Sequence, residues 1–266
     1  MAYLPIEDHG IIGDLHTAAL VGTDGTIDWL CLPRFDAPSV FASILDDAKG
    51  GHFRLRPINP VRSQQLYLPD TNVLLTRFLS PEGVAETTDF MPIEPVGKEH
   101  HQLVRDIHVI RGRLSIEVDC RPAFDYARQE HEVEFVEDGV VFRAPGMALN
   151  LASEVPLKGG PGGSVRARFT LEEGESVSFV LQLLEGDERP RGVLTRAECR
   201  NILQQTLDYW RRWTSRCTYH GRWREMVVRS ALALKLMVYD PTGALVASPT
   251  MGLPETIGGE RNWDYR

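Results

Sequence analysis

One stretch of the chain alternates strictly between apolar and polar side chains: Leu114-Ser-Ile-Glu-Val-Asp-Cys-Arg121. Successive side chains of a strand point to opposite faces, so this period of two predicts a β-strand with one buried face and one hydrated face. The same alternation returns later in the chain, at Val177, Phe179, Leu181 and Leu183. The pattern predicts a series of short antiparallel strands from His52 to about Leu184.

Turn signals separate these runs. Each pairs an acidic residue with a glycine, which supplies the positive φ that tight hairpins need. The pairs are Asp24-Gly25, Glu82-Gly83, Asp138-Gly139 and Glu173-Gly174. The segment Gly159–Gly163 lacks the Lys-Ser/Thr pair of a phosphate-binding loop, and we interpret it as a further strand connection. The predicted fold over residues 1–190 is mainly β: a large antiparallel β-sandwich of ten or more strands.

The period of the pattern changes near Thr195. Residues 195–215 follow helical spacing, and residues 222–239 carry a broader apolar stripe, which Pro241-Thr-Gly243 ends. The second stripe consists of Trp223, Met226, Val227, Ser230, Ala231, Leu234, Met237 and Val238. Such a stripe has to be covered by another element. If the stripe on helix 222–239 is left uncovered, we expect the chain to self-associate as its concentration rises.

Composition indicates a soluble, cytoplasmic protein. The 266 residues carry a formal net charge of −8, which repels phosphate backbones and makes nucleic acid an unfavourable partner. The segment Met1–Gly10 has neither the basic nor the apolar region of a signal peptide. The longest apolar stretch, Ala231–Val238, is too short to span a membrane. No cofactor is predicted.

Histidines and carboxylates near the N-terminus raise the question of a metal site. The residues concerned are Asp8, His9, Asp14 and His16. A metal site needs ligands that converge, and no helix or hairpin spacing supplies that convergence here. The four scattered cysteines form no Cys-x-x-Cys pair either. Capping, turn and surface roles are therefore preferred for these residues and for His100, His101 and His108, and the sequence predicts no metal.

The segment Ala244–Arg266 ends in Asn262-Trp-Asp-Tyr-Arg266, which combines aromatic rings with charged groups. It closely resembles the entry to the catalytic barrel of glycoside hydrolase family 15, which contains glucoamylase-like enzymes, glucodextranases and bacterial trehalases. Further segments resemble the same family in the same order. They are Gly10–His16, Thr26–Phe41, Asp89–Pro92, Arg121–Arg128 and Tyr209–Trp213.

The resemblance implies an architecture and a substrate. Residues 1–190 would form the sandwich, 191–220 a helical linker, and 221–266 the start of an (α/α)6 barrel. The implied reaction is hydrolysis of an α-glucoside with inversion, and the implied substrate-binding residues are Trp263, Asp264, Tyr265 and Arg266. An aromatic ring packs on the apolar face of a sugar, and a carboxylate accepts hydrogen bonds from its hydroxyl groups. The family's catalytic acid and base are expected beyond Arg266, so this chain is predicted to be inactive alone.

Two interpretations remain open. The first is the N-terminal fragment of such a hydrolase; the second is a stand-alone carbohydrate-binding or assembly module with a β-sandwich fold. The amphipathic helix 222–239 favours the first, because an independent module has no use for an uncovered apolar stripe.

A charged, aromatic loop also has two possible roles: packing at an interface is preferred, and a position at the mouth of an active site is the alternative. The loop contains Trp29, Pro33, Arg34, Phe35 and Asp36.

Overall fold

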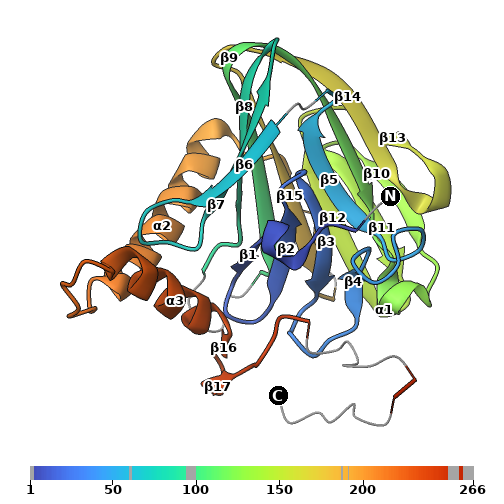
Figure 1. Ribbon diagram of the computed structural model, residues 1–266. Helices are drawn as coiled ribbons and strands as arrows, with labels where there is room; N and C mark the ends of the chain where they lie inside the picture. Colours follow the sequence, from blue (N-terminus) through green and yellow to red (C-terminus); the bar gives the residue numbers. More distant parts are fainter. Residues whose placement is uncertain are drawn as a thin grey trace.

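The computed structural model describes residues 3–59, 62–93, 100–186, 188–190, 192–250 and 258–259. Strands are the main secondary structure, and two long helices follow them (Figure 1). The mainly β prediction is confirmed. Within the described residues, no helix is long and apolar enough to cross a membrane.

Fifteen strands form one continuous antiparallel sheet. Their bounds are β1 (His9–Gly13), β2 (Ala18–Gly22), β3 (Thr26–Cys31), β4 (Ser39–Phe41), β5 (His52–Pro57), β6 (Arg62–Tyr67), β7 (Leu74–Ser80), β8 (Gly83–Phe90), β9 (Gln102–Arg121), β10 (Glu132–Val136), β11 (Gly139–Ala144), β12 (Met147–Ser153), β13 (Lys158–Gly159), β14 (Val165–Glu172) and β15 (Ser176–Leu184). Strands thus begin at His9, earlier than the predicted start at His52. A single helical turn, α1 (Phe124–Ala127), follows β9.

Strand β9 divides the sheet into two packed layers. Its first half pairs with β8 and β15, and its second half pairs with β5 and β14. Gly112 lies between the halves with a φ of +81°, in the left-handed region that favours glycine. A Cβ atom there would lie 2.1 Å from the carbonyl oxygen of Glu82. A strand that changes layers in this way forms a corner of a sandwich.

The alternation of 114–121 is confirmed, because Leu114, Ile116, Val118 and Cys120 are all buried between the layers. Gly25, Gly139 and Gly174 have the predicted positive φ values. Gly83 differs. The turn is formed by the two residues before it, and Gly83 begins β8. There is no room for a side chain at Gly83, because a Cβ atom there would lie 2.2 Å from the carbonyl oxygen of Arg111. Glycine is needed there for close approach.

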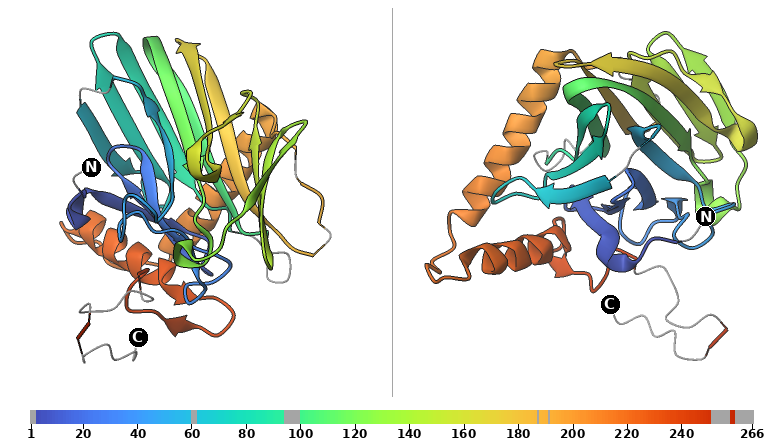
Figure 2. Two further views of the ribbon diagram at one scale, coloured as in Figure 1. Left: turned by 90° about the vertical axis from the view of Figure 1, so that its right-hand side faces the viewer. Right: turned by 45° about the horizontal axis from the view of Figure 1, so that its top comes forward.

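Helix α2 (Arg196–Thr214) covers the outer face of the layer that contains β8, β12 and β15 (Figure 2). Thr195 begins it with a capping box, in which its side chain accepts from the Glu198 amide and the Glu198 carboxylate accepts from the Thr195 amide. Apolar side chains of the sheet and the helix form the contact: Val73, Phe90, Val104, Ala152, Val180, Leu194, Cys199 and Leu207. β15 is therefore buried on both faces, which its predicted alternation does not anticipate.

Helix α3 (Arg224–Leu236) crosses the end of the sheet near β1, and a short hairpin of β16 (Val238–Tyr239) and β17 (Ala244–Leu245) follows it. Val228, Leu232 and Leu236 face inward and pack with Leu15 and Trp210. Much of the predicted apolar stripe lies on the other side. Trp223, Met226, Val227 and Leu234 are exposed, with 52%, 65%, 37% and 58% of their surface accessible. We call these four residues the outer face of α3.

A polar clasp attaches α3 to the turn between β6 and β7. The Arg229 guanidinium donates to the carbonyl oxygen of Thr71 at 2.9 Å and to the Asn72 side chain, and it stacks 3.8 Å over the Tyr67 ring. Asn72 in turn donates to the Leu232 carbonyl oxygen at 3.1 Å. Burial lowers the pKa of Arg229. These contacts fix how the helix is rotated, and so which of its faces points outward.

A buried ion pair joins the two layers at their centre. Arg105 on β9 and Asp89 on β8 are both inaccessible to solvent, and Arg105 Nε lies 2.8 Å from an Asp89 carboxylate oxygen. The same guanidinium donates to the backbone oxygens of Phe53 and Gly25, which belong to the other layer. Each of its three nitrogen atoms therefore helps to hold β8 and β9 against β5 and the turn before β3.

We expect Asp89→Asn to lower the free energy of unfolding by about 3–5 kcal/mol, because it leaves the buried Arg105 charge without its counter-ion. Urea denaturation measures the loss. Glu134→Gln is the control, since the Arg143–Glu134 pair is half exposed and should change stability by no more than about 1 kcal/mol. Equal losses in the two variants would contradict the central role of the buried pair.

We expect Arg229→Met to loosen α3 while the sandwich stays folded. Hydrogen bonds from a charged donor contribute about 1.5–3 kcal/mol each, so amides of 224–236 should exchange with solvent markedly faster. Hydrogen exchange followed by mass spectrometry checks this. Arg222→Met is the matched control, because Arg222 stacks on Trp223 outside the clasp. Unchanged exchange in α3 would show that apolar packing alone holds the helix.

Candidate functional site

Loops from distant parts of the sequence meet at one end of the sandwich. The contributing segments are the β1–β2 turn, the loop after β3, the residue before β9 and the chain after α3. Backbone hydrogen bonds join them: the Phe35 amide donates to the His16 carbonyl oxygen, and the Asp240 amide donates to the Leu15 carbonyl oxygen, both at 2.9 Å. We call this region the loop end of the sandwich.

Asp14 is the centre of the loop end. One carboxylate oxygen accepts from the backbone amides of His16 and Thr17, both at 2.9 Å. The other lies 2.9 Å from Nδ1 of His101. Leu15 between Asp14 and His16 has a φ of +71°, a left-handed conformation that is uncommon for a side chain of this size. The turn therefore holds Asp14 in one orientation, 7% exposed.

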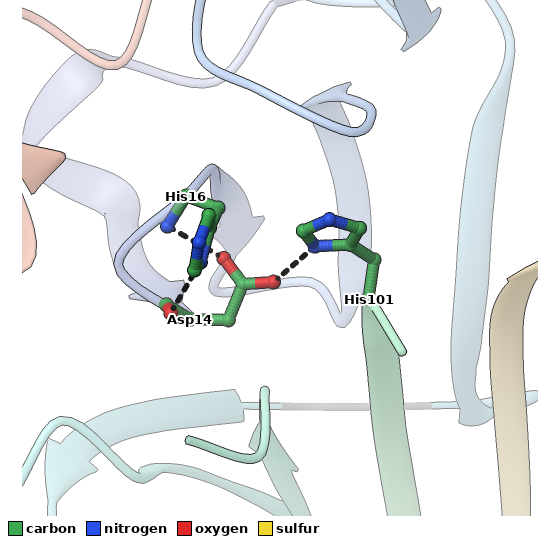
Figure 3. Close-up of side chains that lie close together, drawn as sticks. All are labelled: Asp14, His16 and His101. Carbon is green, nitrogen blue, oxygen red and sulfur yellow. Dashed lines mark hydrogen bonds and ion pairs between the residues drawn. The ribbon is translucent and has the colours of Figure 1, made fainter. Parts of the chain in front are cut away.

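Two imidazoles lie beside this carboxylate (Figure 3). The His16 and His101 rings are 5.3 Å apart, edge to face, and Tyr239 packs on the other side of His16 at 5.7 Å. Each of the three residues Asp14, His16 and His101 has a ligand atom within 4.8 Å of those of the other two. The structure thus supplies convergence that the sequence spacing did not indicate, since His101 is 87 residues from Asp14.

Two of the other candidate histidines, His9 and His108, have structural roles. His9 pairs with Asp28 at 2.7 Å and bonds the Pro5 carbonyl oxygen, and the hydrogen bond to Asp28 is the main reason its pKa is raised. His108 bonds the Glu175 carbonyl oxygen at 3.0 Å. Of the described histidines, aspartates, glutamates and cysteines, only the Asp14 group clusters in a way that suits a metal.

The loop after β3 packs against the C-terminal segment. Trp29 is fully buried, and its Nε1 donates to the Pro249 carbonyl oxygen at 2.8 Å. Phe35 is buried as well, whereas Arg34 and Asp36 form an exposed ion pair. The buried aromatics act in packing, the preferred role from the sequence. The Trp29–Pro249 bond ties the sandwich to the chain that precedes the predicted substrate-binding residues.

The predicted substrate-binding residues Trp263, Asp264, Tyr265 and Arg266 lie outside the described residues. Their placement stays a prediction. The described structure shows that the chain leading to them is attached to the loop end at Trp29 and, through Tyr239 and Asp240, at the β1–β2 turn.

A surface groove lies beside the clasp. It is a groove of about 690 Å³ between the β6–β7 turn and α3. Arg224 and Asp70 form an ion pair in it at 3.1 Å, and Met226 of the outer face lines it. Because both guanidiniums of the groove already have partners in the turn, the groove belongs to the attachment of α3.

Comparison with known proteins places these features in a family. Residues 2–206 match the family model described as trehalase-like, N-terminal. The chain is 40% identical to a trehalase of Thermoplasma volcanium over 99% of its length, and 41% identical to one of Thermoplasma acidophilum over 93%. It is 34% identical to a trehalase of Mycobacterium tuberculosis over 98%. In each case the match covers 42% of the relative's own length. The chain therefore belongs to the family of trehalase-like N-terminal domains.

Proposed function

We propose that this chain is the N-terminal region of a trehalase-like glycoside hydrolase that acts on an α-glucoside. The observation that carries the proposal is the match to relatives named trehalase over nearly the whole chain, at up to 41% identity. The match spans 42% of those relatives, so the catalytic part of such an enzyme is expected in sequence that follows the matched region. Membership of glycoside hydrolase family 15 is part of the proposal and rests on the motif at 244–266.

The sandwich would serve as a base for the catalytic part. Its loop end anchors the chain after α3 through the Trp29–Pro249 hydrogen bond. This attachment supports a role in positioning Trp263, Asp264, Tyr265 and Arg266 at a glucose subsite. There Tyr265 would pack on the apolar face of the sugar, and Asp264 would accept from its hydroxyl groups.

The outer face of α3 supports the same assignment. Trp223, Met226, Val227 and Leu234 are exposed, although burying each such side chain contributes about 1.5–3 kcal/mol. The clasp rotates the helix so that this face points away from the sandwich. A helix with apolar residues on both sides is suited to lie between two layers, and we propose that the helices of the catalytic barrel form the second one.

Inverting hydrolysis needs two carboxyl groups about 6.5–9.5 Å apart, one to protonate the leaving oxygen and one to activate water. We assign neither role to this chain. Glu255 and Glu260 are near the sugar motif in sequence, but neither matches the family's catalytic positions.

We expect the purified 266-residue chain to release no glucose from trehalose, maltose or starch above a buffer blank. Without an acid and a base, the reaction has neither proton donor nor activated water. A coupled glucose assay at high protein concentration checks this. Hydrolysis that Glu255→Gln or Glu260→Gln abolishes would show that the catalytic groups lie in this chain.

We also expect the 266-residue chain to self-associate through the outer face of α3, with an apparent mass that rises with concentration. Light scattering after size exclusion measures it. Met226→Glu with Leu234→Glu should restore a monomer. Asn201→Glu with Gln205→Glu is the control, since it adds the same charge to an exposed surface of α2. A wild-type chain that stays monomeric while binding glucan would favour the stand-alone carbohydrate-binding module.

A further inference from the structure

The Asp14 group has the composition of a metal site. We propose that Asp14, His16 and His101 bind one divalent transition-metal ion, with Zn²⁺ as the best match. This goes beyond the proposed function, because nothing in the hydrolysis of a glucoside requires it. It concerns residues of the sandwich itself.

The donor set selects the class of ion. Two imidazole nitrogens and one carboxylate oxygen suit Zn²⁺ and similar transition ions, whereas Mg²⁺ and Ca²⁺ prefer oxygen ligands throughout. With neutral imidazoles the three side chains carry one negative charge, which favours a dication. Three protein ligands also leave at least one position for water, as in zinc sites that are not closed.

The three ligand atoms are near enough to close on one ion. Zn²⁺ lies about 2.0–2.2 Å from imidazole nitrogen and carboxylate oxygen, so in tetrahedral geometry two of its ligand atoms are about 3.3–3.6 Å apart. The three ligand atoms here lie within 4.8 Å of one another. Binding would therefore draw them together by up to about 1.5 Å, a movement that side-chain rotation can provide.

The surroundings of Asp14 prepare it as a ligand. Its Oδ1 accepts from the His16 and Thr17 amides, which fixes the plane of the carboxylate and leaves Oδ2 directed at His101. His16 Nδ1 lies 3.3 Å from the Asp14 carbonyl oxygen, which holds this ring beside the carboxylate. Hydrogen bonds of this kind orient the ligands in known metal sites. The ion would take the place of the hydrogen between Oδ2 and His101 Nδ1, and His101 would then keep its proton on Nε2.

The ion would link two parts of the chain. Asp14 and His16 belong to the β1–β2 turn, and His101 directly precedes β9. The turn is also bonded to the chain after α3, through Leu15 and Asp240. Metal binding would therefore stiffen the loop end as a unit. Its expected effect is structural, and it can be measured in the absence of any enzymatic activity.

The test is a titration of the metal-free 266-residue chain with Zn²⁺ by calorimetry, and with Co²⁺ by visible absorption. We expect one ion per chain, and d–d bands of Co²⁺ that report nitrogen and oxygen ligands. His16→Asn and His101→Asn should each weaken Zn²⁺ binding by at least about tenfold and change the Co²⁺ spectrum. His108→Asn, a partly exposed histidine elsewhere on β9, is the control and should bind like wild type.

His16→Asn decides the result if His101→Asn fails to fold, because it retains the backbone amide that Asp14 uses. Circular dichroism confirms the fold of each variant. The proposal is overturned if the wild-type chain binds no stoichiometric Zn²⁺, or if folded His16→Asn keeps both the affinity and the Co²⁺ spectrum. Failure here would leave the proposed hydrolase function untouched, since that function is judged by the family match and by glucose release.

Discussion

The two layers of the sandwich depend on one buried charge. Arg105 is inaccessible to water, and it satisfies its donors with Asp89 in its own layer and with two backbone oxygens in the other. An unpaired guanidinium would be very costly there, so the layers can approach only in the arrangement that provides all these acceptors. Phe53 and Phe179 also pack edge to face across the core, but apolar packing tolerates alternative arrangements more readily than a buried charge does. The ion pair therefore favours one relative placement of the two layers over placements in which they are shifted against each other.

The sequence predicted the parts of the sheet that have one wet face. Leu114 to Arg121 alternates because one side of this strand faces the core and the other carries polar side chains, among them Glu117 and Asp119, which form ion pairs at the surface. In β15, Ser178 and Gln182 are buried as well: Ser178 contacts Cys199 of α2, and Gln182 donates to Glu188 in the segment between β15 and α2. Alternation in one strand cannot reveal a helix that packs on its polar side. In α3, helical spacing predicted the element, yet the clasp at Arg229 and Asn72 determines which apolar side faces out.

The candidate site could be predicted less well, for a physical reason. Asp14 and His16 are neighbours in sequence, but the third member, His101, arrives only because β9 returns to the same end of the sheet. Convergence of this kind is a property of the fold, and spacing within one segment does not contain it. The predicted substrate-binding residues Trp263 to Arg266 are the opposite case. Their proposed role is inferred from side-chain chemistry and family resemblance alone, and they lie outside the described residues.

The position of β9 in the sheet also affects the order in which the chain can fold. This strand pairs with β5 and β8, which precede it, and with β14 and β15, which follow it. During synthesis the layers cannot close until residue 184 has left the ribosome, and sheets built from such distant pairings fold in milliseconds to seconds. Helix α3 emerges soon afterwards. The surface that receives its inner face, which includes Leu15 and Trp210, is complete by then, so the helix can dock as it forms.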